Sequence, residues 1–193
     1  MKKVLMLMIA LWCVSMGFSC SMSRVQTPSD IVRSSITDYT QSMECMTPEF
    51  LVAPVLCRAP VSGARMSRAG KGTEHGEKFY HLYVNDPGGY VATVMGEQDA
   101  PVGLTLVKES HYAKVVGVEA HGPTGTRAVR RPDGVSDLFV MMKIGEPDTP
   151  DTDMGWIYAT ASPLGEIESI GMIESCIRCH RDADHDRLFG IAP

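Results

Sequence analysis

The sequence predicts an α+β fold that is mainly an antiparallel β-sheet, with N-terminal helices and one short C-terminal helix. Three observations lead there. Helix-start signals stand near the beginning of the mature chain. From Lys78 onward, alternating apolar segments are separated by turn-forming residues, which is typical of antiparallel strands. The last apolar stretch, Ile167 to Cys179, shows helical spacing through Ile170, Ile173 and Ile177.

Composition and charge limit the architecture and the partners. The 193 residues are 44% apolar and 21% charged, which suits one packed domain and is too apolar for a disordered chain. The formal net charge of −5 argues against a nucleic-acid partner. We therefore divide the chain into a leader at 1–20, an N-terminal helical and loop segment at 21–77, and a β-rich domain at 78–193.

The first twenty residues have the pattern of a signal peptide. Lys2 and Lys3 precede an uncharged run from Val4 to Ser19, which is too short to be a comfortable membrane span. We expect an exported, periplasmic protein. Cys20 could carry a lipid that anchors the chain to the outer membrane. Gly17 stands where lipoprotein signals usually have an aliphatic residue, so ordinary cleavage nearby stays open.

The segment at 21–77 predicts helices followed by a loop. Pro28-Ser29-Asp30 reads as a helix start with Ser29 as the cap, and a second helical stretch is expected around Glu49 to Leu56. Ser62 to Glu77 is rich in small and basic residues and reads as a loop. In an oxidising compartment Cys45 and Cys57 could close a disulfide loop or stay free, and the sequence leaves both open.

The β-rich domain is expected to hold five strands. Turn-rich pieces separate them, including Asn85 to Gly89 and the proline-containing stretch Gly145 to Asp153. The strands are expected at Phe79 to Val84, Val102 to Ser110, Ala113 to Glu119, Asp137 to Ile144 and Gly155 to Ala161.

A motif near the C-terminus indicates a covalently attached cofactor, in the run Cys176-Ile177-Arg178-Cys179-His180. Two thiols separated by two residues can add to the two vinyl groups of haem, and a histidine directly after the second thiol reaches the iron from the same side. The alternatives, a redox cysteine pair or half of a zinc site, lack a βαβ pattern or a second ligand pair. We expect haem c, held by Cys176 and Cys179, with His180 as the iron ligand.

The sixth position of the iron is expected to be open. Met141, Met142 and Met154 could in principle bind it, but the chain has 13 methionines, which mostly act as adaptable core residues.

Lys108 occupies an unusual place in an apolar strand. Alternation puts Val102, Leu104, Leu106 and Lys108 on one face, which is the expected core side. A buried lysine tends to be paired, deprotonated or reacted. The alternative, which the strand alone favours, is that the strand ends at Val107 and that Lys108 extends to water.

Several segments together resemble the cytochrome P-460 family over roughly Phe79 to Gly190. They are Leu82 to Pro87, Pro101 to Glu109, Gly155 to Tyr158, the haem motif, and Asp186 to Phe189. The resemblance implies a small β-rich c-type cytochrome with a five-coordinate haem, whose best-known members oxidise hydroxylamine. It also implies a lysine bonded to the haem ring, and Lys108 falls on that position, which reverses the preference above.

One departure concerns the residue that faces the iron. Hydroxylamine-oxidising members carry a distal carboxylate, expected here near Phe139, Val140 or Met141, where none stands. Glu109 and Glu119 are weaker substitutes, because Glu109 points away from Lys108 and reads as a surface residue. An apolar cap instead resembles the related cytochromes c-prime-beta, which bind nitric oxide, and makes Phe139 the candidate distal cap.

His81 is a further candidate for a polar distal group, with Tyr80 beside it. The remaining histidines carry no motif and are assigned no role; they are His75, His111, His121 and His185.

These residues support an exported monohaem c-type cytochrome that acts on small nitrogen species, by hydroxylamine oxidation or nitric oxide binding. Whether it is an enzyme, a haem-dependent oxidoreductase, stays open. The alternative is an electron-transfer cytochrome with a six-coordinate haem; a gas sensor is weaker because no output domain accompanies the sheet. Expected partners are a small nitrogen ligand and a redox protein, and a homodimer is a further candidate.

Overall fold

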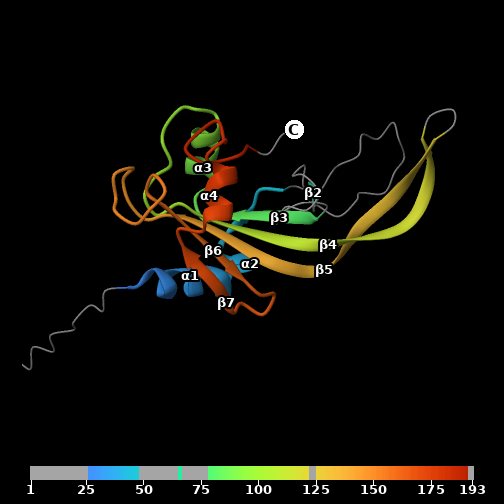
Figure 1. The fold of residues 1–193 in the computed structure, drawn as a ribbon, viewed down its shortest axis with the longest axis horizontal. Coiled ribbons are helices and arrows are strands. Elements are labelled where there is room, and N and C mark those ends of the chain that lie inside the picture. Colours follow the sequence, from blue (N-terminus) through green and yellow to red (C-terminus); the bar gives the residue numbers. More distant parts are fainter. Residues whose placement is uncertain (1–25, 48–64, 67–77, 122–124, 191–193) are drawn as a thin grey trace, which may run out of the picture.

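One antiparallel sheet organises the chain (Figure 1). The computed structural model describes residues 26–47, 65–66, 78–121 and 125–190. The seven-stranded sheet has the order β1-β3-β4-β5-β6-β7, and β2 also pairs with β3. Its strands are β1 (Glu44–Cys45), β2 (Arg65–Met66), β3 (Phe79–Val84), β4 (Thr105–His121), β5 (Gly125–Lys143), β6 (Trp156–Ala161) and β7 (Ile167–Gly171). The helices are α1 (Pro28–Thr37), α2 (Tyr39–Ser42), α3 (Pro87–Val94) and α4 (Glu174–His180). The expected β-rich α+β class is confirmed.

The N-cap of helix α1 lies two residues earlier than the sequence predicted. Thr27, not Ser29, is the N-cap: its hydroxyl accepts from the backbone N–H of Asp30, whose carboxylate accepts from the Thr27 backbone N–H. This reciprocal pair is a capping box, and Pro28 fits the first helical position because it has no N–H to leave unsatisfied. Val32 and Ile36 then bury the helix against the sheet.

Strands β4 and β5 form one long hairpin. The sequence predicted separate strands at Val102 to Ser110 and Ala113 to Glu119, which is wrong because a single strand runs from Thr105 to His121. The strand continues through His111 and Tyr112 because β5 pairs with both residues, across register shifts on either side of His111, and β3 pairs as far as His111. Beyond the other strands the hairpin projects as an arm (Figure 1). The arm consists of residues 112–121 of β4 and 125–133 of β5, and most of its described side chains are exposed.

Two further elements correct the sequence reading. The predicted turn after β3 contains α3, which starts with Pro87 and is capped by Asp86 through the Gly89 backbone N–H. The stretch predicted as helical from Ile167 first forms β7, which pairs with β6, before a glycine at φ +110° ends the strand at Gly171. Tertiary pairing overrides the isoleucine spacing here.

The N-terminal segment also contributes strands to the sheet. The stretch predicted as a loop at 62–77 contains β2, which pairs with β3. The helical stretch predicted at 49–56 lies outside the described residues, as do Cys57 and the leader with Cys20. No helix in the described ranges is long and apolar enough to cross a membrane.

The two faces of the sheet carry different cores. We call one the α4 face, because its side chains pack with Ile177 of α4; its other members include Leu82, Val84, Leu106, Met141, Trp156 and Tyr158. We call the other the α1 face, because its side chains pack with Val32 and Ile36; its other members include Val107, Leu138, Val140, Met142 and Ile157. Figure 1 shows α3 and α4 on one side of the sheet and α1 and α2 on the other.

Candidate cofactor site

Helix α4 carries the three motif side chains: Cys176 packs against the sheet, His180 packs against Tyr158 of β6, and Cys179 is exposed. The spacing places the motif on one side of the helix, because Cys179 and His180 follow Cys176 by three and four positions. Ile177 is 4% exposed and anchors the helix in the α4-face core, where Cys176 also packs. An acidic Glu174 in the first turn and basic residues in the last turn suit the helix dipole.

The imidazole of His180 is held in one orientation. Its Nδ1 lies 2.7 Å from the backbone carbonyl oxygen of Arg187, and because a carbonyl only accepts, Nδ1 carries the proton. The lone pair therefore resides on Nε2. The ring also packs against Tyr158 and Phe189, with centroid distances of 5.6 and 5.3 Å. Burial lowers the pKa of His180, so the imidazole is neutral at pH 7.

A buried network holds the carbonyl that orients His180. The Arg187 side chain donates Nε and an Nη to the two oxygens of Asp153, at 2.9 and 2.8 Å. Tyr158 donates its hydroxyl to the same carboxylate at 2.8 Å. Burial opposes ionisation of Asp153, but these bonds outweigh it and hold its pKa below the usual range. The network fixes the backbone of the segment that contacts His180.

The same segment has a second anchor at Asp186. Its carboxylate accepts from Lys143 Nζ at 2.8 Å, from Trp156 Nε1 at 3.0 Å and from the Ala100 backbone N–H at 2.9 Å. The backbone φ angles of Asp186 and Arg187 are positive, at 38° and 66°. This unusual turn is thus held by the side chains of Lys143 and Trp156 and by the backbone N–H of Ala100.

Lys108 lies on the α4 face, as alternation predicts. It is directly opposite Leu82 on β3 and Phe139 on β5, and its Nζ lies 4.4 Å from the Tyr80 ring centroid. The alternative, in which the strand ends at Val107, is wrong because β4 continues to His121. Burial, assisted by the charge of Lys78, lowers the pKa of Lys108 to about 8.

Lys108 and His180 belong to one electrostatic environment. The positive charge of Lys108 contributes to the lowered pKa of His180, although the two residues come from different elements. The structure therefore brings Lys108 to the same face of the sheet as helix α4, which carries the Cys-x-x-Cys-His motif. A lysine whose pKa approaches neutrality is also a better nucleophile than a solvated one.

Phe139 and a carboxylate share the end of this face. Phe139 is half-buried, and Lys78 Nζ lies 5.7 Å from its ring centroid. Lys78 also forms an ion pair of 2.6 Å with Asp137, two positions before Phe139 on β5 and so on the same side of the strand. Sequence reasoning looked for a carboxylate only at 139–141 and missed Asp137. Alternation within the strand could have found it.

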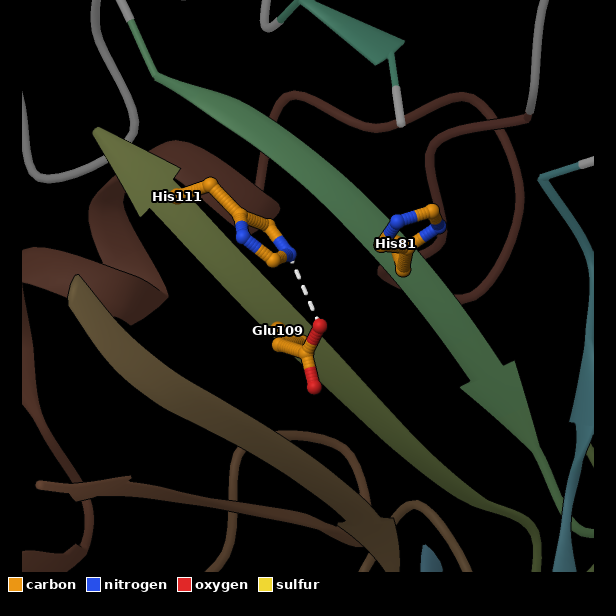
Figure 2. Close-up of side chains that lie close together, drawn as sticks. All are labelled: His81, Glu109 and His111. Carbon is orange, nitrogen blue, oxygen red and sulfur yellow. Dashed lines mark hydrogen bonds and ion pairs between the residues drawn. The ribbon is translucent and has the colours of Figure 1, made fainter. Parts of the chain in front are cut away.

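His81 and Glu109 lie on the opposite face, so His81 is not a distal group on the α4 face. Glu109 points away from Lys108 as expected, but it is buried at 8% exposure and is not a surface residue. It accepts from the Tyr39 hydroxyl and contacts His111 Nε2 at 2.7 Å. His111 was assigned no role from the sequence. Figure 2 shows His81, Glu109 and His111 converging from β3 and β4.

The methionines proposed as alternative ligands are dispersed. Met141 is buried on the α4 face, Met142 is buried on the α1 face, and Met154 is 44% exposed. Glu119 lies on β4, the same strand as Glu109, in the exposed arm. Cys45 is a free thiol.

The residues of α4 fit covalently attached haem. Cys176 and Cys179 are not joined in a disulfide, His180 offers a neutral Nε2, and the adjoining core of the α4 face is apolar. A search of protein-family models gives no match to the chain, and none of the curated proteins is significantly similar to it.

Proposed function

We propose that this chain is an exported monohaem c-type cytochrome whose five-coordinate haem acts on small nitrogen species, by hydroxylamine oxidation or nitric oxide binding. The observation that carries the proposal is the motif on α4, with His180 Nδ1 fixed on the Arg187 carbonyl so that Nε2 is available. Haem held there supplies a redox-active iron that exchanges electrons with the ligand and with a redox partner protein. The absorption spectrum of the holoprotein, with and without nitric oxide, tests this. A protein without covalent haem after export would contradict it.

Three side chains attach and orient the cofactor. Cys176 and Cys179 form thioethers with the vinyl groups, and His180 binds the iron through Nε2. Asp153, through Arg187, keeps the imidazole from rotating, in the way that outer partners of ligating histidines do. We expect Asp153→Asn to broaden or shift the absorption bands that report axial ligation, while Asp133→Asn, in the exposed arm, leaves them unchanged.

Lys108 is proposed as a third covalent contact. Its place on the α4 face, its low pKa and the resemblance to the cytochrome P-460 family support this. Thioether formation only adds groups, whereas a bond from Nζ to a ring carbon replaces two hydrogens. The bonded protein is therefore lighter by two hydrogens than the sum of chain and haem. That bond also releases two protons and two electrons, and a two-electron oxidant of the peroxide class must accept the electrons.

Mass spectrometry separates the outcomes. Digested wild type should give a haem peptide that includes Lys108 together with Cys176 and Cys179, and Lys108→Arg should lose the extra peptide. Lys78→Arg is the matched control, because Lys78 is on the same face and should leave the peptide unchanged. A wild-type haem peptide with the two cysteines alone refutes the bond.

Phe139 is proposed as the distal cap, with Asp137 as the nearest described carboxylate on its strand face. An apolar side chain at this position favours binding of nitric oxide over oxidation of hydroxylamine. The oxidation needs a proton acceptor within hydrogen-bond reach of the substrate. Phe139→Glu should therefore raise hydroxylamine turnover, and Phe139→Gln, of the same size but neutral, should not. If Asp137 already accepts protons, Asp137→Asn lowers the turnover of wild type. No change in the Phe139→Glu variant means that another residue faces the iron.

The second candidate is a six-coordinate electron carrier, and the position of Met141 is the observation that favours it. Met141 is 9% exposed on the α4 face and has a thioether able to bind iron. Met141→Leu keeps the volume and removes that ligand. If nitric oxide leaves the wild-type absorption spectrum unchanged and alters the spectrum of the variant, the protein is a six-coordinate electron carrier.

Location and assembly are proposed from the sequence and the arm. Export to the periplasm, with or without a lipid on Cys20, is tested by the mass of the mature N-terminal peptide.

The arm exposes Tyr112, Val115, Val116 and Val118, each at least 49% accessible, and these offer an apolar surface for a homodimer. Light scattering after size-exclusion chromatography decides between monomer and dimer, with Val118→Lys expected to disrupt the dimer.

A further inference from the structure

A second cluster of ligating side chains lies on the α1 face, away from α4. His81 on β3 is directly opposite Glu109 on β4, and His111 follows Glu109 by two residues on the same side of the strand. One ligand atom from each residue lies within 4.8 Å of the others. The strands hold these positions through backbone pairing, so the convergence does not depend on a loop (Figure 2).

The cluster is enclosed and rich in donors. The side chains of Glu109 and His111 are 11% and 13% exposed, and His81 is half-buried. Within the described ranges Glu109 forms no ion pair with lysine or arginine; its oxygens contact the Tyr39 hydroxyl and His111 Nε2. A carboxylate this buried requires a positive charge nearby, and a protonated histidine or a cation can provide it.

Outer contacts hold the possible ligands in place. His81 Nδ1 lies 3.3 Å from the buried Thr47 hydroxyl and 3.9 Å from Cys45 Sγ, which leaves Nε2 for a metal ion. The Thr47 hydroxyl in turn accepts from the Leu82 backbone N–H at 3.3 Å. Metal-binding histidines usually have such a second partner.

We propose that His81, Glu109 and His111 form a metal site separate from the haem motif, which binds Zn²⁺ or another divalent first-row transition metal. Two imidazoles and one carboxylate are a common donor set for these ions, with the remaining position open to water. Ligands of a tetrahedral zinc ion lie roughly 3.3 Å apart, given bonds of about 2.0–2.1 Å. The ion therefore replaces the Glu109–His111 hydrogen bond and draws the three ligand atoms, which lie within 4.8 Å of one another, to about 3.3 Å apart.

Binding of Zn²⁺ to chelator-treated holoprotein tests the proposal. Isothermal titration calorimetry should give one saturable site in wild type, weakened at least tenfold in His81→Gln, Glu109→Gln and His111→Gln. The control is His185→Gln, because His185 lies beside Gly96 in the segment that follows α4, and this variant should bind zinc like wild type. Using holoprotein keeps His180 engaged on the iron, and an unchanged Soret band in each variant shows that the haem domain is folded.

X-ray absorption at the zinc edge identifies the ligands. We expect nitrogen and oxygen neighbours only, with the scattering pattern of imidazole, and the same spectrum in Cys45→Ser. No saturable site in wild type refutes the proposal. So does wild-type affinity in both histidine variants, loss of binding in His185→Gln alone, or a zinc site dominated by sulfur.

Discussion

The ion pair between Lys143 and Asp186 should be a main determinant of stability near the proposed haem site. The two side chains are 2% and 8% exposed and are 2.8 Å apart. Replacing Asp186 with Ala leaves the Lys143 ammonium buried without its charged partner, although its bond to the Met154 carbonyl at 2.7 Å remains. The substitution also leaves two donors, Trp156 Nε1 and the Ala100 backbone N–H, without the carboxylate oxygens that accept from them.

The expected cost is large for a single substitution. Breaking a buried pair by removing one partner costs about 3–5 kcal/mol. Each of the other lost hydrogen bonds adds about 1 kcal/mol. The total is about 5–7 kcal/mol, which corresponds to a melting temperature lower by about 10–28 °C for a domain of this size. Urea unfolding followed by far-ultraviolet circular dichroism measures the free energy directly.

A double-mutant cycle separates the ion pair from general disruption. Lys143→Met removes the charge at similar volume, so the combined variant Asp186→Ala/Lys143→Met should lose less than the sum of the two single variants, by at least about 2 kcal/mol. The pair Lys114–Asp133 is the surface control, since its side chains are 63% and 57% exposed, and Lys114→Ala should cost under about 1 kcal/mol. Additive losses in the cycle, or a loss below about 1 kcal/mol for Asp186→Ala, would refute the reasoning.

Three further pairs of substitutions test the scaffold by the same unfolding assay. Thr27→Ala removes the capping box of α1 and should cost about 1 kcal/mol, whereas Thr27→Ser, which keeps the hydroxyl, should cost little. Gly155 has a φ angle of +83°, and Gly155→Ala puts a Cβ 2.1 Å from a backbone carbonyl oxygen. It should destabilise the protein more than Gly103→Ala, where nothing lies within 4 Å of the added Cβ and only backbone strain of about 1–2 kcal/mol applies. Ile177→Ala should cost about 2–5 kcal/mol and Ile177→Val about 0.5–1.5 kcal/mol, and equal losses would mean that α4 is not anchored by this side chain.

The strands in which apolar and polar side chains alternate could be predicted from the sequence. The errors arose because alternation does not show where a strand ends or which segments pair. The period of two placed Lys108 and Leu106 on one face, and the structure confirms this because β4 is paired on both edges. The same pattern could not show that β4 continues past Ser110, since polar residues there are retained by pairing. Nor could it show β7, whose isoleucines also fit a helix.

The candidate cofactor site was predictable as a motif but not as an environment. The spacing of Cys176, Cys179 and His180 is local and can be read from sequence. The partner of His180 is a backbone carbonyl, which any residue provides, so no sequence signal marks Arg187 for that task. The cluster of His81, Glu109 and His111 depends on which strands are neighbours and on their register, information that lies in the fold.

Strand β4 links the two proposed sites through its register. Lys108 and Glu109 are consecutive residues, so they necessarily point to opposite faces, one toward α4 and the other toward the histidine cluster. A slip of one residue would exchange the two side chains and abolish both sites. Asn85 opposes such a slip, because its side chain donates to the Gly103 carbonyl at 2.9 Å and accepts from the Thr105 backbone N–H at 2.8 Å. The start of the strand is thereby fixed three residues before the lysine, and a metal ion joining β3 to β4 would fix it again on the far side.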